Sequence, residues 1–258
     1  MKKILKKPYF QKSTVVVARN LLGKFLVRRI KGKEIAAMIT EVEAYDGFKD
    51  KASHAHRGKT ARNAVMFGEA GVWYVYLTYG MHWMLNVVTG PKDYPAAVLI
   101  RGVLISDRPR DPTSETRNHP PPVFPNGCVS EVGSPKIGQQ SSTWRHPKSK
   151  SREPQYLGLR MSGPGKLTKF FKIDKRFNGK KADKKSELWV EERKSFGKVY
   201  GERSRTTQDV LRAKFKIQKS PRIGVDYAGP VWSKKHYRFY LDIKKPANRG
   251  RLRGAYLE

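Results

Sequence analysis

Between positions 72 and 80 the chain reads Val72-Trp73-Tyr74-Val75-Tyr76-Leu77-Thr78-Tyr79-Gly80. β-branched and aromatic residues dominate this run, and such residues pack well on a pleated sheet, so the run predicts a β-strand. Glycine directly after the last aromatic residue is typical of a tight turn. We therefore expect an aromatic strand at 72–79 that ends in a turn, with Tyr79 at its tip.

A second predicted strand lies upstream and carries two acids. It reads Ile39-Thr40-Glu41-Val42-Glu43-Ala44-Tyr45. Successive side chains of a strand point to opposite faces, so Glu41, Glu43 and Tyr45 share one face. A turn at 31–33 precedes this strand, and residues 24–45 therefore predict a β-hairpin. Periodicity alone does not choose between Glu41 and Glu43 as a functional acid.

Three more elements are predicted in the first part of the chain. Apolar spacing and end signals predict a helix at 14–22 and strands at 85–88 and 96–105. Residues 46–70 are polar and rich in glycine and charge, which predicts a loop with a short helix. Arg101 lies within the apolar strand 96–105 and needs a partner, either a buried acid or a ligand in a cleft, and both remain open.

The composition changes after residue 105. Between 106 and 154, proline, glycine, glutamine and serine stand among charges with few apolar residues, which predicts a disordered insertion. Beyond it we expect an amphipathic segment at 162–171, three short strands at 188–190, 223–227 and 236–243, and a basic tail at 244–258. Residues 1–258 are predicted to form a single domain of the mixed α+β class, built on a curved antiparallel β-sheet with flanking helices.

The chain is strongly basic. It has 54 Lys and Arg against 22 Asp and Glu, which gives a net charge of +32. Self-repulsion on this scale opposes compaction, so the excess indicates a polyanionic partner, most often DNA or RNA. A protein of the membrane surface would need an amphipathic helix with an apolar stripe opposite its lysines, and we predict none.

Cysteine content and the N-terminal sequence favour a reducing, internal compartment. Cys128 is the only cysteine, so neither an intrachain disulfide nor a thiolate zinc cluster is possible. The basic N-terminus is followed by no apolar run of signal-peptide length, and we do not expect secretion. We expect the cytoplasm or nucleoid of a bacterium, or the nucleus of a eukaryote.

Several short motifs stand in a particular order along the chain. They are Glu41-Val42-Glu43-Ala44-Tyr45, Ala52-Ser53-His54, Arg62-Asn63, Met66-Phe67, Tyr74-Val75-Tyr76, Tyr79-Gly80-Met81, Asn86, Leu99-Ile100-Arg101, Gly163-Pro164-Gly165-Lys166-Leu167, Pro221-Arg222-Ile223-Gly224 and Arg238-Phe239-Tyr240. Through these motifs and their order, the chain resembles the alkyladenine (3-methyladenine) DNA glycosylase family. The resemblance is close over 14–104 and looser over 156–243. The resemblance implies a DNA repair enzyme that flips alkylated purines out of duplex DNA, excises them by hydrolysis and leaves an abasic site. Its substrates would be 3-methyladenine, bases of the 7-methylguanine type and hypoxanthine.

The resemblance assigns catalysis to Glu43. Cleavage of an N-glycosidic bond builds positive charge on the sugar, and a nearby carboxylate can both deprotonate the attacking water and stabilise that charge. No metal and no organic cofactor is implied. We expect a monofunctional enzyme, because a lyase needs an amine nucleophile and no lysine stands in a motif that marks it for this. Taken alone, the two acids would indicate an exposed edge strand.

The resemblance also implies a pocket for the flipped base. Tyr45, His54 and Tyr76 would form its walls, since electron-rich rings suit a cationic methylated purine. Asn86 would lie near the edge of the base and help to reject unmodified guanine, and Arg101 would bond near the flipped nucleotide or its phosphate. Taken singly, these residues would indicate core tyrosines and a loop histidine.

Two further groups would contact the duplex. Tyr79 would enter from the minor groove and fill the space of the flipped nucleotide, although taken alone it would indicate an exposed hairpin tyrosine. Gly163, Gly165 and Lys166, at a predicted helix start, would contact the DNA backbone together with Arg222. The expected partner is double-stranded DNA containing alkylated or deaminated purines, and we expect a monomer.

The chain departs from the family pattern at three points. The insertion at 106–154 falls where the family usually continues with a short acidic and helical stretch, the charge is high for the family, and Ala61 stands where proline is common. Besides the glycosylase, two alternatives therefore remain. One is a noncatalytic basic DNA- or RNA-binding protein of the same fold, and the other is a formyltransferase-type RNA-binding module. Intact motif residues such as Glu43 and His54 count against both.

Overall fold

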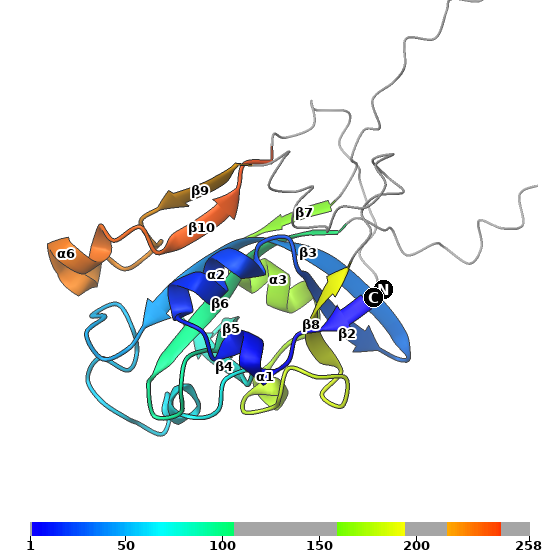
Figure 1. Cartoon of the computed structure of the whole chain (residues 1–258), viewed down its shortest axis with the longest axis horizontal. Helices are drawn as coiled ribbons and strands as arrows, with labels where there is room; N and C mark the ends of the chain where they lie inside the picture. Colours follow the sequence, from blue (N-terminus) through cyan, green and yellow to red (C-terminus); the bar gives the residue numbers. More distant parts are fainter. Residues whose placement is uncertain (1, 106–158, 194–215, 244–258) are drawn as a thin grey trace, which may run out of the picture. The chain divides into compact units, whose positions relative to one another are not determined.

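The acidic strand is the longest strand that the structure describes. The structure is a computed structural model, and it describes residues 2–105, 159–193 and 216–243. Strand β3 spans Lys33–Asp46 and lies within an antiparallel sheet, where it curves along its length (Figure 1). It pairs with β2 (Phe25–Ile30) on one edge, so the predicted hairpin is confirmed. On its other edge it pairs with β6 (Ala96–Ile105).

Ten strands make up this sheet. The main path runs β1-β8-β2-β3-β6-β5-β4, while β7 pairs with β6, and β10 pairs with both β3 and β9. The other bounds are β1 Lys2–Ile4, β4 Trp73–Thr78, β5 His82–Val88, β7 Leu159–Ser162, β8 Leu188–Arg193, β9 Ile217–Ser220 and β10 Arg238–Leu241. The path does not return on itself, so the sheet is open. The predicted mixed α+β class with an antiparallel sheet is confirmed.

Short helices flank the sheet. The helix predicted at 14–22 is confirmed as α2, whose Val17, Ala18 and Leu21 are buried in the main core. The amphipathic segment predicted at 162–171 contains α3, which begins at Pro164, because proline suits the first turn of a helix. The helical bounds are α1 Lys7–Phe10, α2 Thr14–Leu21, η1 Ala64–Phe67, α3 Pro164–Phe170, η3 Lys175–Phe177, η4 Asp226–Ala228 and α6 Gly229–Ser233.

Residues 216–243 form an arm that contains β9, η4, α6 and β10 and lies along β3 (Figure 1). The strand predicted at 223–227 is wrong. The strand of this region is β9, which ends before Pro221, since a proline nitrogen cannot donate to a sheet ladder. The sequence carries no clear signal for β1 or β7, because three or four residues show too little periodicity. The insertion predicted at 106–154 and the tail predicted at 244–258 lie outside the described residues.

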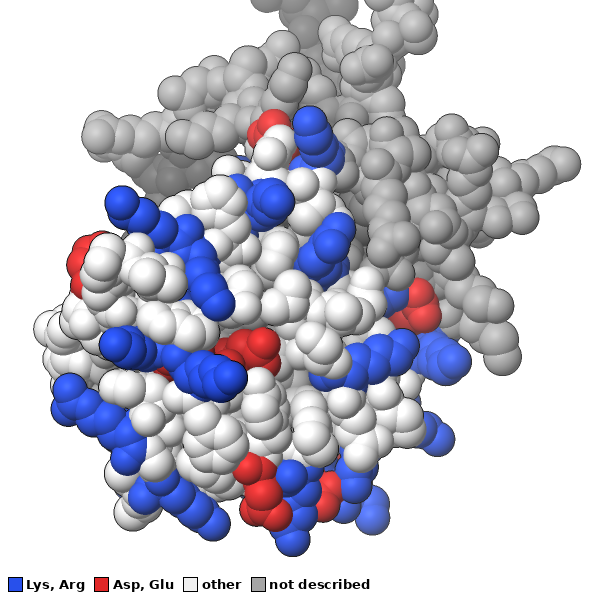
Figure 2. Space-filling view, turned by 60° about the vertical axis from the view of Figure 1, so that its left-hand side comes forward, with Lys and Arg blue, Asp and Glu red and all other residues white. Residues whose placement is uncertain are grey.

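Positive charge is distributed over the whole of the face shown in Figure 2 rather than concentrated in one patch. In Figure 2 the side of the arm is turned forward, and Lys and Arg side chains are spread over the visible face. Acidic side chains show there only as small separate patches. A face of this kind attracts a polyanion over a broad area rather than at one point.

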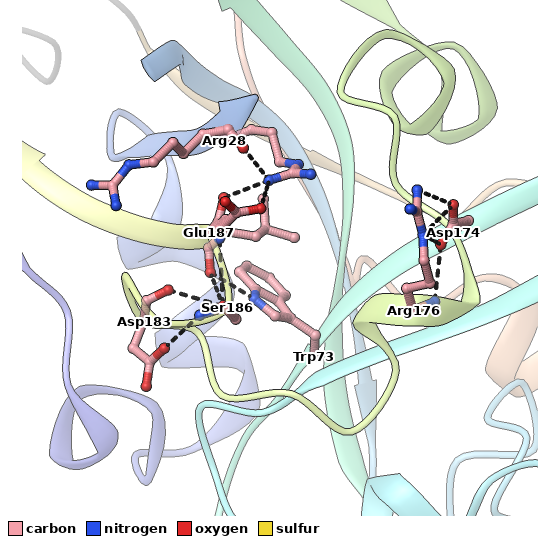
Figure 3. A network of polar contacts seen from close by, with 9 residues as sticks. Arg28, Trp73, Asp174, Arg176, Asp183, Ser186 and Glu187 are labelled. Atoms are coloured by element: carbon pink, nitrogen blue, oxygen red, sulfur yellow. Dashed lines mark hydrogen bonds and ion pairs between the residues drawn. The ribbon is translucent and has the colours of Figure 1, made fainter. Parts of the chain in front are cut away.

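The start of β4 is fixed by a polar network around Trp73 (Figure 3). The Trp73 ring is fully buried, and its indole N–H donates to the carbonyl oxygen of Leu188 at 2.9 Å. The Ser186 hydroxyl donates to the same oxygen at 2.9 Å. Arg28 holds the neighbouring Glu187 through an ion pair of 3.2 Å. These contacts join the aromatic strand to β8 and give it a rigid base.

Replacing Trp73 with Phe removes the indole hydrogen bond and leaves unfilled volume in the core. We expect the free energy of unfolding to fall by about 1–3 kcal/mol, measured by urea denaturation. Val16→Ala, at an exposed position of α2, should change it by less than about 0.5 kcal/mol. Equal effects of the two changes would contradict the anchoring role of Trp73.

Candidate active site

A cavity of about 560 Å³ opens beside the curved part of β3. Its lining comes from separate parts of the chain, namely 45–54, 66–86, 97–101, 162–166 and 223–227. Nine of the residues predicted from the sequence line it: Tyr45, His54, Tyr76, Tyr79, Asn86, Arg101, Gly163, Gly165 and Lys166. Segments more than a hundred residues apart therefore meet at one concave site.

Glu43 lies directly behind this lining. Its side chain is fully buried, and its carboxylate accepts three hydrogen bonds. Oε2 accepts the Tyr45 hydroxyl at 2.9 Å and Nη1 of Arg101 at 3.2 Å, and Oε1 accepts the backbone N–H of Ile223 at 2.9 Å. All three donor residues line the cavity. The carboxylate is thus separated from the cavity only by the residues that hold it.

Glu41 occupies a different environment, although it points to the same face of β3. Its Oε1 accepts Nε of Arg238 at 2.7 Å and Nε of Arg101 at 3.3 Å. Neither acid lines the cavity itself, but two guanidinium groups neutralise the charge of Glu41, and one of them, that of Arg238, lies outside the lining. The structure therefore separates the two acids that strand periodicity leaves equivalent.

A β-bulge places Arg101 between the two acids. The register of β3 and β6 shifts on both sides of Glu41, so that Glu41 pairs with Gly102 while Val42 pairs with Ile100. Bulges of this kind re-aim a side chain, and Arg101 reaches both carboxylates as well as the cavity. Gly102 permits the close approach, because a Cβ there would lie 3.0 Å from Cβ of Glu41. Of the two explanations left open for Arg101, the ion pair with a buried acid is confirmed.

Aromatic rings form one wall of the cavity. The His54 and Tyr76 rings meet edge to face with centroids 4.5 Å apart, and Tyr74 lies 5.2 Å from Tyr76. His54 Nδ1 and the Tyr74 hydroxyl are 3.1 Å apart. The Asn63 side chain donates to the carbonyl oxygen of His54 at 2.9 Å and so fixes the loop that carries this histidine. The wall is therefore held by contacts between one strand, β4, and one loop.

The wall is also electrically neutral. Burial raises the pKa of Tyr76 and raises the pKa of Tyr74 to about 12. Burial, with the Glu43 charge, raises the pKa of Tyr45 well above its ordinary value. For His54, burial and then the nearby Arg62 charge lower the pKa. Near neutral pH the tyrosines keep their protons, and His54 favours the uncharged form.

Tyr79 stands at the tip of the β4–β5 hairpin. It is 85% exposed, and its backbone has φ +49°, a left-handed conformation that is unusual for a bulky residue. The Met81 N–H donates to the carbonyl oxygen of Thr78 at 3.2 Å and closes the turn. Backbone strain of this kind persists where the surrounding structure holds it. The turn therefore presents a large ring to solvent at the rim of the cavity.

The start of α3 also lines the cavity. Gly163 has φ +104°, which only glycine adopts readily, and its N–H donates to the carbonyl oxygen of Arg101 at 3.0 Å. Gly165 packs closely on His82, and the Lys166 side chain is exposed. Deeper in the cavity, the Asn86 amide donates to the carbonyl oxygens of Tyr74 and Met84 at 3.1 and 3.3 Å.

Arg222 does not reach the surface. Its side chain is completely buried, and it donates to both oxygens of Asp50, at 2.5 and 2.8 Å. The DNA-backbone contact predicted for Arg222 therefore does not fit the structure. A basic residue in a Pro-Arg-Ile-Gly loop is usually exposed, and its partner, 172 positions away, could not be found from the motif.

Several residues of the lining carried no site prediction, among them Tyr74, His82, Ile223 and Tyr227. Tyr74 stands two positions before Tyr76 on one strand, so period two could have indicated it. His82, Ile223 and Tyr227 reach the cavity only through tertiary structure. The Tyr227 hydroxyl donates to the carbonyl oxygen of Ala52 at 3.0 Å and ties the arm to the histidine loop.

Two further observations concern the described parts of the chain, 2–105, 159–193 and 216–243. Within them, no three His, Cys, Asp or Glu side chains are grouped in a way that could hold a metal ion. None of the helices there has the length and apolar character needed to cross a membrane.

Comparison with known proteins gives one family. A family model described as methylpurine-DNA glycosylase (MPG) matches residues 8–245. A protein of Methanocella arvoryzae is 35% identical over 237 residues, which cover 92% of each chain. A protein of Desulfitobacterium hafniense is 35% identical over 243 residues, 93% of this chain and 96% of its own. A protein of Chlorobium phaeobacteroides is 50% identical over 101 residues, 39% of this chain and 52% of its own. Each is named "Putative 3-methyladenine DNA glycosylase".

The fold, the ring-walled cavity and these matches define a DNA glycosylase of base excision repair. The chain belongs to the methylpurine-DNA glycosylase family, and the resemblance inferred from the motifs is confirmed.

The charge of Arg62 should hold His54 in its uncharged form. Arg62 donates to the carbonyl oxygen of Leu77 at 2.8 Å, and its charge opposes protonation of the imidazole. In Arg62→Gln we expect the pKa of His54 to rise, so that the imidazole takes its proton at a higher pH. NMR titration of the ring protons would measure this. Arg57→Gln, on the same loop, should leave the titration unchanged, and equal shifts in both variants would contradict the assignment.

Proposed function

We propose that this protein excises alkylated purines from duplex DNA by monofunctional hydrolysis and leaves an abasic site. The observation that carries the proposal is the buried carboxylate of Glu43 behind a ring-walled cavity of about 560 Å³. This volume lies within the usual range for small-molecule pockets. The proposed substrates are 3-methyladenine and bases of the 7-methylguanine type, with hypoxanthine as a neutral substrate.

In the proposed reaction, water attacks the sugar carbon C1′ while the bond from C1′ to purine N9 breaks. Glu43 accepts a proton from that water, and its negative charge stabilises the positive charge that develops on the sugar. The bonding electrons leave with the base, so a cationic methylated purine departs as a neutral molecule. The hydrogen bonds from Tyr45 and Arg101 orient the carboxylate for this role.

The neutral ring wall suits a cationic base. Tyr45, His54 and Tyr76 would stack on the flipped purine, and aromatic faces attract a cation placed over them. A positively charged His54 would repel that base, and burial with Arg62 keeps its pKa low. Asn86 would lie near the edge of the base and help to exclude unmodified guanine.

The rims of the cavity would hold the duplex open. Tyr79, exposed at the hairpin tip, would enter the minor groove and replace the flipped nucleotide in the stack. At the start of α3, the exposed Lys166 side chain and the turn at Gly163 and Gly165 would contact the DNA backbone. We propose that the protein acts on DNA as a monomer, in the nucleoid of a bacterium or the nucleus of a eukaryote.

Glu43→Gln should remove excision and keep DNA binding. The amide cannot accept the proton of water or stabilise the charged sugar, so we expect the rate of base release to fall by about 10²–10⁴-fold. The measurement is single-turnover release from duplexes with one defined lesion, followed by alkaline cleavage at abasic sites. Strand cleavage by the wild type without alkali would contradict the monofunctional assignment.

Two control variants on the same strand make this result specific. Glu34→Gln, at an exposed position of β3, should leave excision unchanged. Glu41→Gln should retain more activity than Glu43→Gln, because two arginines neutralise Glu41 and one of them, Arg238, lies outside the cavity lining. Full activity in Glu43→Gln, or a larger loss in Glu41→Gln, would refute the assignment of Glu43.

Tyr79→Ala should weaken flipping without weakening general DNA binding. The alanine cannot offset the unstacking of the target base, so we expect excision to fall by about 10–100-fold. Affinity for lesion-free duplex, measured by fluorescence anisotropy, should change by less than about twofold, because phosphate contacts dominate it. Tyr79→Phe keeps the ring and should retain excision. Equal losses of lesion excision and lesion-free binding would argue against intercalation by Tyr79.

A further inference from the structure

Arg222 and Asp50 form an ion pair whose two side chains have no exposed surface. The guanidinium binds both carboxylate oxygens, and it also donates to the carbonyl oxygen of Ala44 at 2.9 Å and to that of Trp232 at 3.3 Å. Its partner Asp50 accepts the backbone N–H groups of Asp46 and Ala52, both at 3.1 Å. One buried pair thus fastens the arm both to the end of β3 and to the loop that follows it.

Two residues in contact with this pair or next to it, Tyr45 and Ile223, bind Glu43 in the candidate active site. The guanidinium carbon of Arg222 lies 4.8 Å from the centroid of the Tyr45 ring, whose hydroxyl donates to Glu43. The next residue of the arm, Ile223, donates its backbone N–H to the other oxygen of Glu43. Arg222 therefore contacts the ring of one donor to the Glu43 carboxylate, Tyr45, and directly precedes a second donor, Ile223, in the chain.

Stability alone is a weak reason for this arrangement. Burial removes both charges from water, and well-packed apolar residues of similar volume are often at least as stable as a buried ion pair. A planar guanidinium offers something that apolar residues lack, which is several donors in a fixed geometry. In this protein those donors set the position of the arm relative to β3.

We propose that the Asp50–Arg222 pair is a positioning device for base excision, which aligns the Glu43 carboxylate by fixing the Tyr45 ring and the Ile223 N–H. Neither residue touches the reacting atoms. This inference rests on the proposed function, since it says which residues position Glu43, the proposed general base. Misplacement of a reacting group by about 1 Å can lower a rate by about a hundredfold, so small shifts of the arm should be visible in the chemical step.

The chain offers a matched control in Arg28 (Figure 3). Like Arg222, Arg28 is largely buried, pairs with a carboxylate, donates to backbone carbonyl oxygens and lies over an aromatic ring, that of Phe177 at 4.7 Å. It lies on β2 against the network around Trp73, and neither Arg28 nor its partner Glu187 lines the cavity. The same substitution at the two arginines therefore separates loss of a buried arginine from loss of alignment.

The experiment compares Arg222→Lys, Arg28→Lys and the double variant Asp50→Leu with Arg222→Met. The substrate is duplex DNA with labelled methyl groups on its purines, and release is measured in single turnover with enzyme in excess. We expect Arg222→Lys to slow release by about tenfold or more and Arg28→Lys to change it by less than about twofold. Urea unfolding should show a loss of stability in both variants, larger in Arg222→Lys because Asp50 is fully buried whereas Glu187 is half exposed. Affinity for lesion-free duplex should stay within about twofold of the wild type in all of them.

The double variant distinguishes position from stability. It removes both charges, so it should fold with a stability closer to the wild type than Arg222→Lys, while release stays slow. A stable double variant with the wild-type rate would overturn the inference. An equal loss of rate in Arg28→Lys would also overturn it, because the effect would then be a general one.

Hydrogen exchange at the Ile223 amide gives a readout that does not depend on activity. We expect this amide to exchange about tenfold faster in the double variant, and an unchanged rate would refute the positioning role. If the wild type releases no methylated base, the proposed function fails. In that case the exchange rate still decides whether the pair positions Ile223 against Glu43.

Discussion

Two buried carboxylates on one strand constrain the rest of the structure. Glu41 and Glu43 are 4% and 0% exposed, and a buried carboxylate is unfavourable unless hydrogen-bond donors or cations surround it. One donor lies on the same strand, and the others come from two parts of the chain that are distant in sequence. The donors are Tyr45 of β3 itself, Arg101 of β6, and Arg238 and the backbone N–H of Ile223 in the arm. The acids therefore decide where the neighbouring strand and the arm can lie, and apolar packing of the core then stabilises that arrangement.

The same requirement explains why the sheet is irregular at this point. A regular β3–β6 ladder would pair residues one for one, and the bulge instead brings Arg101 within reach of both acids. Gly102 makes this possible because it has no Cβ to collide with Glu41. Arg101, the residue displaced by the bulge, also lines the cavity, together with side chains from several other segments. The irregularity of the fold and the chemistry of the site thus have one physical origin.

The sequence predicts the parts of this structure that depend on local pattern. Alternation gave the β2–β3 hairpin and β4, apolar spacing gave α2, and most residues assigned to the cavity do line it. It did not predict the features that depend on distant partners. Arg222 is read as a surface residue because the local motif does not reveal Asp50, and the strand placed at 223–227 ignores the stop that Pro221 imposes. Tyr227 joins the cavity through a bond to Ala52, 175 positions away. Local patterns specify elements and motif residues, whereas burial and partners follow only from the assembled fold.

The placement of charge favours catalysis over binding alone. A protein that only gripped DNA would gain from positive charge at its surface, which this chain has in excess, but burying a carboxylate behind a DNA-facing cavity would weaken attraction to a polyanion. Glu41 is offset by two arginines, and its charge is largely cancelled within the sheet. Glu43 shares Arg101 and otherwise relies on neutral donors, so more of its negative charge remains directed towards the neutral wall of the cavity. An acid kept in this state is unfavourable for stability and for affinity, and it becomes useful only when positive charge develops beside it, as on a sugar that is losing its base.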